Sequence, residues 1–172
     1  MLKENKINLL EEKTDDDLKT EAIIANYRKL AGDNALKMKE CYEKSQNEFK
    51  TGDKKLAKEL SEQGKLYKEK IKENNDLAMV TAFNYKNKGK ELNEIDFHLL
   101  LVDEAIKYLS ERIEAIKSTN ISSLVVIHGQ GIHSDKNESR IKNACYKYLD
   151  ENKIFYTKDN PIKGCLTISF FC

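Results

Sequence analysis

The residues best suited to chemistry lie in one stretch, residues 124–134, which reads LVVIHGQGIHS. Four apolar residues, three of them β-branched, lead directly into His128-Gly129-Gln130-Gly131, and a charged segment follows. β-branched residues favour strands, and glycine permits backbone conformations and close approaches that a Cβ would block. The unpaired N–H groups at the start of a following helix suit a phosphate. The stretch therefore predicts a buried strand, a glycine turn and a helix start that together bind phosphate.

The three histidines of the chain lie in two places. His128 and His133 flank the glycine turn, and His98 ends a short alternating run at residues 95–98. Asp96 precedes His98 by two positions, so both side chains lie on one face of a strand. In a strand–helix–strand unit, parallel strands bring their carboxyl ends to one edge of the sheet. We therefore expect these four residues to converge beside the turn.

Chemistry at a bound phosphate ester needs a base for the attacking hydroxyl, an acid for the leaving oxygen and hydrogen-bond donors for the phosphate charge. His98 and His128 are the candidate acid and base, because imidazole titrates near neutral pH. Asp96 is a candidate to orient a histidine or to act as the base itself. The candidate phosphate or nucleic-acid contacts are the turn residues Gly129, Gln130 and Gly131, followed by His133, Ser134, Lys136 and Arg140.

Each of these side chains also has a structural interpretation. A histidine at the end of a strand is commonly a structural residue, Asp96 could bond only to backbone, and His133 could stabilise a loop. Lys136 and Arg140 could belong to a solvated helix face. Two histidines and one aspartate from different strands are a weak set of metal ligands. We therefore predict no cofactor and assign no metal-binding residue, with a divalent metal left open.

Composition favours long solvated helices around a modest core. Of the 172 residues 34% are charged, with one proline and no tryptophan. No apolar run reaches about 18 residues, and the N-terminus lacks the apolar centre of a signal peptide, so we expect a soluble, cytoplasmic protein with no membrane partner. The four cysteines have no CxxC spacing and predict neither a zinc site nor a disulfide framework.

The first half of the chain is predicted to be helical throughout. Residues 1–17 are predicted to form a flexible acidic tail, with one aspartate of the triplet at 15–17 capping a helix. Within a helical extension at 18–90, apolar spacing predicts helices at 18–30 and 35–49, separated at Gly32-Asp33, and a third from 56 to about 88. Gly52-Asp53 predicts a helix stop followed by an N-cap.

Charge is unevenly spread along the chain. The net charge of +1 argues against a dedicated polyanion binder, but residues 27–91 are its most basic part. The basic residues form either a solvated helix face or a patch that touches nucleic-acid phosphates.

From residue 92 the periodicity changes. Strands are predicted at 95–98, 124–128, 154–157 and 166–171, and helices at 102–116 and 138–149. Asp135 and Glu138 have capping-box spacing at the second helix, and a turn is predicted around residues 160–164. The order is βαβαββ, which makes residues 92–172 an α/β (α+β) domain.

Part of the helical extension resembles a known module. The resemblance spans residues 27–88 and rests on Tyr27, Ala31, Ala35, the stretch 57–64 (AKELSEQG), Asn74, Ala78 and Asn87. The module is the helical domain of unknown function that often precedes small MutS-related (Smr) domains in eukaryotes. It implies no chemistry of its own.

Residues 92–172 resemble an Smr domain. The Leu-Asp-x-His motif of that family corresponds to Ile95-Asp96-Phe97-His98, its His-Gly-x-Gly motif to residues 128–131, and its following His-Ser to His133-Ser134. Residues 140–149 and 164–166 continue the similarity in order and spacing. The resemblance implies a fold like the C-terminal domain of translation initiation factor three, with a mixed four-stranded sheet and two helices. It also implies nucleic-acid binding, with nuclease activity in many members.

Two functions follow from this resemblance. Eukaryotic members with this architecture are linked to endonucleolytic cleavage of mRNA on stalled ribosomes, so we prefer an endoribonuclease acting in mRNA quality control, with RNA and the ribosome as partners. The alternative is a noncatalytic module that binds structured RNA, branched DNA or the ribosome.

The sequence departs from the family pattern in two places. Leu99 stands where the family usually has glycine, and Leu101 stands where a polar helix cap is usual. A leucine at position 99 would be strained if the turn there needs a positive φ. The noncatalytic function gains support if Leu99 fills the cleft or if Asp96 points into the core.

Overall fold

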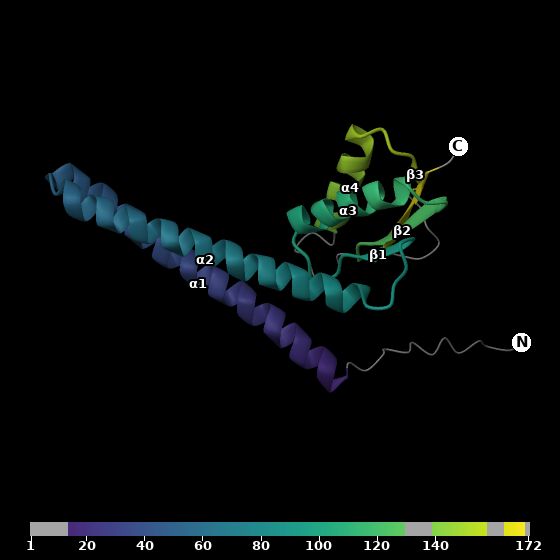
Figure 1. Cartoon of the computed structure of the whole chain (residues 1–172), viewed down its shortest axis with the longest axis horizontal. Helices are drawn as coiled ribbons and strands as arrows, with labels where there is room; N and C mark the ends of the chain where they lie inside the picture. Colours follow the sequence, from purple (N-terminus) through teal and green to yellow (C-terminus); the bar gives the residue numbers. More distant parts are fainter. Residues whose placement is uncertain (1–13, 130–138, 158–163, 171–172) are drawn as a thin grey trace, which may run out of the picture.

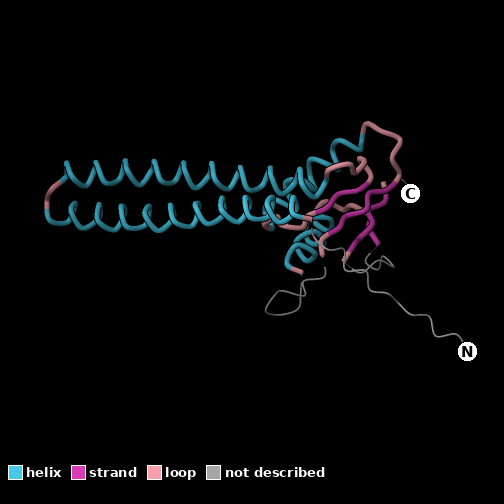
Figure 2. The backbone as a smooth tube through the Cα atoms, turned by 90° about the horizontal axis from the view of Figure 1, so that it is seen from below, coloured by secondary structure: helices cyan, strands magenta, loops and turns pink. Residues whose placement is uncertain are grey.

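A long helical hairpin forms the N-terminal part of the protein. The computed structural model describes residues 14–129, 139–157 and 164–170. Helices α1 (Asp15–Thr51) and α2 (Lys54–Asn87) pack side by side, and at 1.5 Å per residue each is roughly 50 Å long. Figures 1 and 2 show both helices extending away from a smaller domain of strands and short helices.

The ends of α1 are set by local side-chain chemistry. The Thr14 hydroxyl accepts a hydrogen bond from the Asp17 N–H (3.2 Å), and the Asp17 carboxylate accepts one from the Thr14 N–H (2.9 Å). The predicted aspartate cap is therefore wrong: Thr14 is the cap, and residues 15–17 form the acidic first turn instead of the end of a tail. Gly52, with φ 99°, ends α1, and Asp53 caps α2, which confirms the predicted stop.

The predicted interruption at Gly32-Asp33 is also wrong. α1 is a single helix of 37 residues that passes through this position. A glycine inside a helix costs only about 0.5–1 kcal/mol. Burial of Ile24, Ala31 and Cys41 in the hairpin outweighs that cost, because apolar burial contributes on the order of 1 kcal/mol or more per side chain. Tertiary packing thus overrides the local break.

The C-terminal domain has the predicted βαβαββ order. Its elements are β1 (Glu94–Asp96), α3 (Val102–Lys117), β2 (Ser123–Ile127), α4 (Arg140–Glu151), β3 (Tyr156–Thr157) and β4 (Cys165–Ser169). The four strands lie in the order β1-β2-β4-β3, with β1 parallel to β2 and β4 antiparallel to both of its neighbours. A mixed four-stranded sheet with two helices is therefore confirmed. α3 and α4 pack against each other beside the sheet (Figure 1).

α4 begins slightly later than predicted. Its cap is Ser139, whose hydroxyl accepts a hydrogen bond from the Lys142 N–H (3.2 Å). The predicted Asp135 and Glu138 capping pair lies outside the described residues, as does most of the turn at 160–164. The start predicted at residue 138 is thus replaced by Arg140 as the first helical residue.

Alternation along β1 decides which side chains serve the core. Ile95 and Phe97 are fully buried, whereas Asp96 between them points to the other side of the strand. The core around them is completed by the fully buried Leu109, Ile116, Leu124, Val126, Cys145, Leu149, Leu166 and Ile168. Ile95 in β1 and Phe97 just after it therefore fix the direction in which Asp96 and the following His98 project.

Candidate active site

Asp96 and His98 form a hydrogen-bonded pair at the carboxyl end of β1. Asp96 Oδ1 lies 2.7 Å from His98 Nδ1 and accepts the His98 backbone N–H at 2.8 Å. Burial raises the pKa of Asp96, but the hydrogen bonds from the His98 ring and backbone together lower it more, so the pKa ends below its usual value. An ionised carboxylate only accepts, so the proton of a neutral His98 ring lies on Nδ1. Nε2 then carries the free lone pair.

The two partners of this pair differ in exposure. The side chain of His98 is 48% exposed, whereas that of Asp96 is 14% exposed. The imidazole is therefore accessible to a ligand in solution, whereas the carboxylate that holds it is largely covered by protein. Asp96 points toward His98 instead of into the core, which is the arrangement expected of a catalytic pair.

His128 occupies the end of β2 in a different environment. Its ring is buried, and Nδ1 lies 2.7 Å from the carbonyl oxygen of Gly129. Burial lowers the pKa of His128, the bond to Gly129 partly offsets this, and the charges of Lys142 and His98 lower it further. The ring is therefore neutral near pH 7 with its proton on Nδ1. Within the described part of the chain, the buried Nε2 has no hydrogen-bond partner.

The first glycine of the turn brings the two strand ends together. Gly129 has φ 75°, and a Cβ placed on it would lie 2.9 Å from His98 Nε2. The imidazole of His98 thus packs directly against the backbone of the turn. The predicted convergence of Asp96, His98 and His128 beside the turn is confirmed, because β1 and β2 are adjacent parallel strands. The fourth residue of that prediction, His133, lies outside the described residues.

Two residues that were not among the predicted site residues, Gly164 and Ser139, hold the turn in place. The Gly164 carbonyl accepts hydrogen bonds from the N–H groups of His128 (2.9 Å) and Gly129 (3.1 Å). The buried Ser139 hydroxyl donates to the His128 carbonyl (3.1 Å). Ser139 is recognisable as a helix cap from its type and its place before an apolar periodic segment, but its bond across the turn is a tertiary contact.

The remaining predicted contacts are only partly described. Arg140 is the first residue of α4 and is exposed, directly after Ser139. Among the described residues it forms no ion pair. Gln130, Gly131, His133, Ser134 and Lys136 lie outside the described residues, so their roles stay predictions. In the same described ranges, no three His, Cys, Asp or Glu side chains come together as a metal site, and no helix is long and apolar enough to span a bilayer.

Comparison with protein families matches both halves of the chain. Residues 25–87 match DUF1771, a domain of unknown function, and residues 95–161 match the Smr domain. The chain contains an Smr domain preceded by a DUF1771 domain. Both predicted resemblances are confirmed in their order along the chain. The first match, 25–87, nearly coincides with the predicted 27–88, and the second, 95–161, lies within the predicted 92–172.

Three relatives share about one third of their aligned residues with this Smr protein. An Smr domain-containing protein of Schizosaccharomyces pombe is 32% identical over 133 residues, which are 77% of this chain and 65% of that one. Endonuclease NBR9 of Saccharomyces cerevisiae is 32% identical over 141 residues, 82% of this chain and 59% of that one. NEDD4-binding protein 2 of Homo sapiens is 34% identical over 148 residues, 83% of this chain and 8% of that one. The chain thus spans less than two thirds of each relative.

Two solved structures are also similar to the Smr chain. The solution structure of the B3BP Smr domain has 33% identity and a TM-score of 0.45, covering 56% of this chain and 96% of that one. The solution structure of the SMR domain of NEDD4-binding protein 2 has 32% identity and a TM-score of 0.38, covering 49% and 91%.

Leu99 of the Smr domain meets the condition under which strain was expected. Its φ is 68°, in the left-handed region, and the residue is 40% exposed. A left-handed conformation costs a residue with a Cβ about 1–2 kcal/mol, which glycine avoids. Glycine also loses more conformational freedom on folding, and this reduces the gain by about 0.5–1 kcal/mol. Leu99→Gly is therefore expected to raise the free energy of unfolding by about 0.5–1 kcal/mol in urea denaturation.

The matched control is Leu99→Ala, which removes the same exposed side chain but keeps the Cβ. It is expected to give no gain in stability. Equal stability of the glycine and alanine variants would show that the positive φ stores no strain.

Acid is expected to destabilise the Smr domain through His128. Burial lowers the pKa of His128 in the folded chain, whereas the unfolded chain has the ordinary value of about 6.5. As the pH falls through that value, the unfolded chain takes up a proton that the folded chain does not, so the free energy of unfolding decreases. Urea denaturation at about pH 7.5 and about pH 5.5 measures the loss.

His128→Asn is expected to lose less stability than wild type over the same pH interval, since asparagine does not titrate. Asp96 does not contribute there, because its folded pKa lies below 3.8 and its contribution is lost only in stronger acid. An identical pH dependence in His128→Asn and wild type would contradict this assignment.

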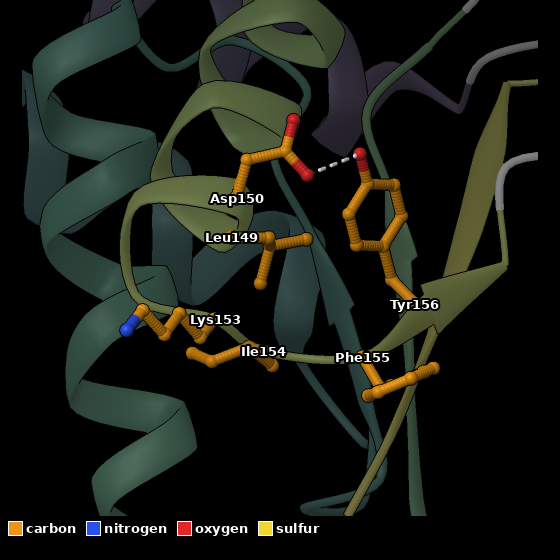
Figure 3. Close-up of a pocket in the computed structure, with 6 residues that line it drawn as sticks. All are labelled: Leu149, Asp150, Lys153, Ile154, Phe155 and Tyr156. Atoms are coloured by element: carbon orange, nitrogen blue, oxygen red, sulfur yellow. Dashed lines mark hydrogen bonds between the residues drawn. The ribbon is translucent and has the colours of Figure 1, made fainter.

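A pocket elsewhere in the Smr domain is separate from the candidate site (Figure 3). Its walls are Leu149, Asp150, Lys153, Ile154, Phe155 and Tyr156. These residues end α4 and lead into β3, whereas Ser139, which contacts the turn, begins α4. The helix between them is 12 residues long, roughly 18 Å. No predicted site residue lines this pocket.

Proposed function

We propose that this Smr-domain protein is an endoribonuclease that cleaves mRNA, with stalled ribosomes presenting the substrate. The observation that carries the proposal is the Asp96–His98 pair, an exposed imidazole held by an ionised carboxylate. The Smr match supports nucleic-acid binding. A relative named an endonuclease supports nuclease chemistry.

His98 is the proposed catalytic residue. Its Nε2 atom takes the proton of the attacking hydroxyl, and the Asp96 carboxylate fixes the ring and stabilises the imidazolium that forms. Asp96 acts through His98 and is therefore a positioning residue in this proposal. An acid must also protonate the leaving oxygen, and this role is left to a water molecule.

His128 has a supporting part in the same proposal. Its neutral ring is buried, with Nδ1 bonded to Gly129, so it shapes the turn against which His98 packs. The Gly129 N–H is occupied by the Gly164 carbonyl, so the proposed phosphate donors begin with the N–H groups that follow it, at Gln130 and Gly131. Arg140, exposed at the start of α4, supplies the positive charge for a neighbouring phosphate.

The proposal is tested by a cleavage assay. Wild-type protein and the double variant Asp96→Asn, His98→Ala are incubated with end-labelled single-stranded RNA and with branched DNA, in magnesium or in EDTA. Cleavage of RNA by wild type alone supports the proposal, and retention of cleavage in EDTA assigns the chemistry to side chains. Absence of cleavage with equal binding by both proteins, on free RNA and on ribosome-bound mRNA, would favour the noncatalytic binding module instead.

A further inference from the structure

Asn87, the last residue of α2, forms hydrogen bonds with both the N–H and the carbonyl of Asp96. Its Nδ2 donates to the Asp96 carbonyl (2.9 Å), and its Oδ1 accepts the Asp96 N–H (2.8 Å). β1 is an edge strand, paired with β2 on its other side. The amide of Asn87 therefore takes the place that a neighbouring strand would have at this one residue.

The position of Asn87 is itself fixed by packing at the base of the hairpin. Its Nδ2 also donates to the Phe83 carbonyl (3.0 Å), one turn earlier in α2. The Phe83 ring stacks on Tyr108 of α3, with centroids 3.7 Å apart and planes 10° from parallel. Ala78, Met79 and Ala82 of α2 are buried in the same apolar cluster as Ile95 of β1. The hairpin and the Smr domain thus share one core where Asn87 lies.

A second link joins the hairpin to Leu101, at the other end of the segment that begins at Asp96. Arg28 of α1 forms an ion pair with Glu104 (2.6 Å), and both side chains are largely buried. The same Glu104 oxygen accepts the N–H of Leu101 (2.9 Å), the residue before α3. Leucine offers no side-chain acceptor at this cap position, so Glu104 and its partner Arg28 define the start of the helix.

The two links bracket the segment that carries His98. Asn87 holds residue 96, and Arg28 holds residue 101 through Glu104. Between them Leu99 is kept at φ 68°, a conformation that persists only where the surroundings impose it. The direction of the imidazole thus depends on residues of the helical hairpin.

We propose that the DUF1771 hairpin is a structural part of the active site and that Asn87 is a positioning residue for the Asp96–His98 pair. This inference rests on the proposed endoribonuclease function. It gives the hairpin a definite role: it sets the geometry of the site, with Arg28 and Glu104 as a second anchor.

The test compares Asn87→Ala with Asn74→Ala in the full chain. Asn74 is a matched control, because it lies on the same helix and makes the same kind of bond to the carbonyl four residues earlier (Nδ2 to Lys70, 2.7 Å) but is exposed. Asn87→Ala is expected to lower kcat for RNA cleavage about 10- to 100-fold with KM nearly unchanged, since small displacements of a catalytic group have effects of this size. Asn74→Ala is expected to match wild type.

Two NMR measurements report positioning without any cleavage. The Asp96 amide proton, which Asn87 accepts, is expected to exchange with solvent faster in Asn87→Ala. The nitrogen shifts of the His98 ring are expected to show loss of the preference for a proton on Nδ1. Neither signal should change in Asn74→Ala.

The outcomes separate the two proposals. If wild type cleaves RNA and Asn87→Ala cleaves equally well with an unchanged ring tautomer, the positioning role is overturned and the nuclease remains. If wild type does not cleave, the nuclease fails, and amide exchange and tautomer still decide the positioning role. Should Asn87→Ala fail to fold, Arg28→Met tests the second anchor, and an unchanged His98 tautomer in that variant would overturn the proposal.

Discussion

The His98→Gln variant is expected to cleave RNA about 10²- to 10⁴-fold more slowly than wild type, because it removes the only exposed imidazole of the described site. Glutamine fills a similar volume and has an amide N–H that can donate a hydrogen bond to the Asp96 carboxylate. Single-turnover rates on end-labelled RNA, with enzyme in excess, measure the chemical step separately from binding.

Binding provides the control for this first prediction. The affinity of His98→Gln for the same RNA at fixed salt is expected to stay within about threefold of wild type, because in the proposal the phosphate contacts of the turn and Arg140 supply most of the affinity. A variant that cleaves at the wild-type rate would remove His98 from the mechanism. A variant that no longer binds RNA would assign His98 to binding instead.

The Gly129→Ala variant is expected to lose both stability and activity. Its φ of 75° costs a residue with a Cβ about 1–2 kcal/mol, but alanine also has less freedom than glycine to lose from the unfolded chain, which offsets about 0.5–1 kcal/mol. The free energy of unfolding is therefore expected to fall by about 0.5–1 kcal/mol. The new Cβ would also lie 2.9 Å from His98 Nε2, so the ring must move. A displaced general base is expected to slow cleavage by a further 10- to 100-fold, roughly, beyond any loss of folded protein. Urea denaturation and single-turnover cleavage measure the two effects.

Gly52 supplies the matched control at the hairpin tip. Its φ is 99°, and a Cβ there would meet nothing within 4 Å. Gly52→Ala is therefore expected to lose stability through its backbone alone and to cleave RNA as wild type does. If Gly129→Ala and Gly52→Ala show the same rate of cleavage, the contact between the turn and His98 has no functional effect.

The convergence of the strand ends was predictable because it follows from short-range pattern and one topological rule. Alternation around Ile95 and Phe97 directs Asp96 and His98 to one face, and a parallel pair of strands brings His128 to the same edge. The glycine usual at position 99 raised the question of a positive φ there, and the φ of 68° answers it. These features need only local sequence and the order of elements.

The errors and omissions concern contacts between distant parts of the chain. The continuity of α1 through Gly32 depends on packing against α2, which outweighs the local preference. Asn87 and Ser139 have ordinary sequence contexts, a helix end and a helix cap, and their bonds to Asp96 and His128 arise only in the folded protein. A hydrogen bond from a polar side chain to a backbone group far away in the sequence produces no periodic pattern, so it cannot be predicted from periodicity.

The central claim is that Asp96 and His98 act as one unit, and a double-mutant cycle on RNA cleavage tests it most directly. Single-turnover rates are measured for wild type, Asp96→Asn, His98→Gln and the double variant. If Asp96 acts only through His98 Nδ1, the double variant is expected to cleave within about twofold of His98→Gln alone. Multiplication of the two single losses in the double variant would contradict the account and show that Asp96 contributes independently of His98.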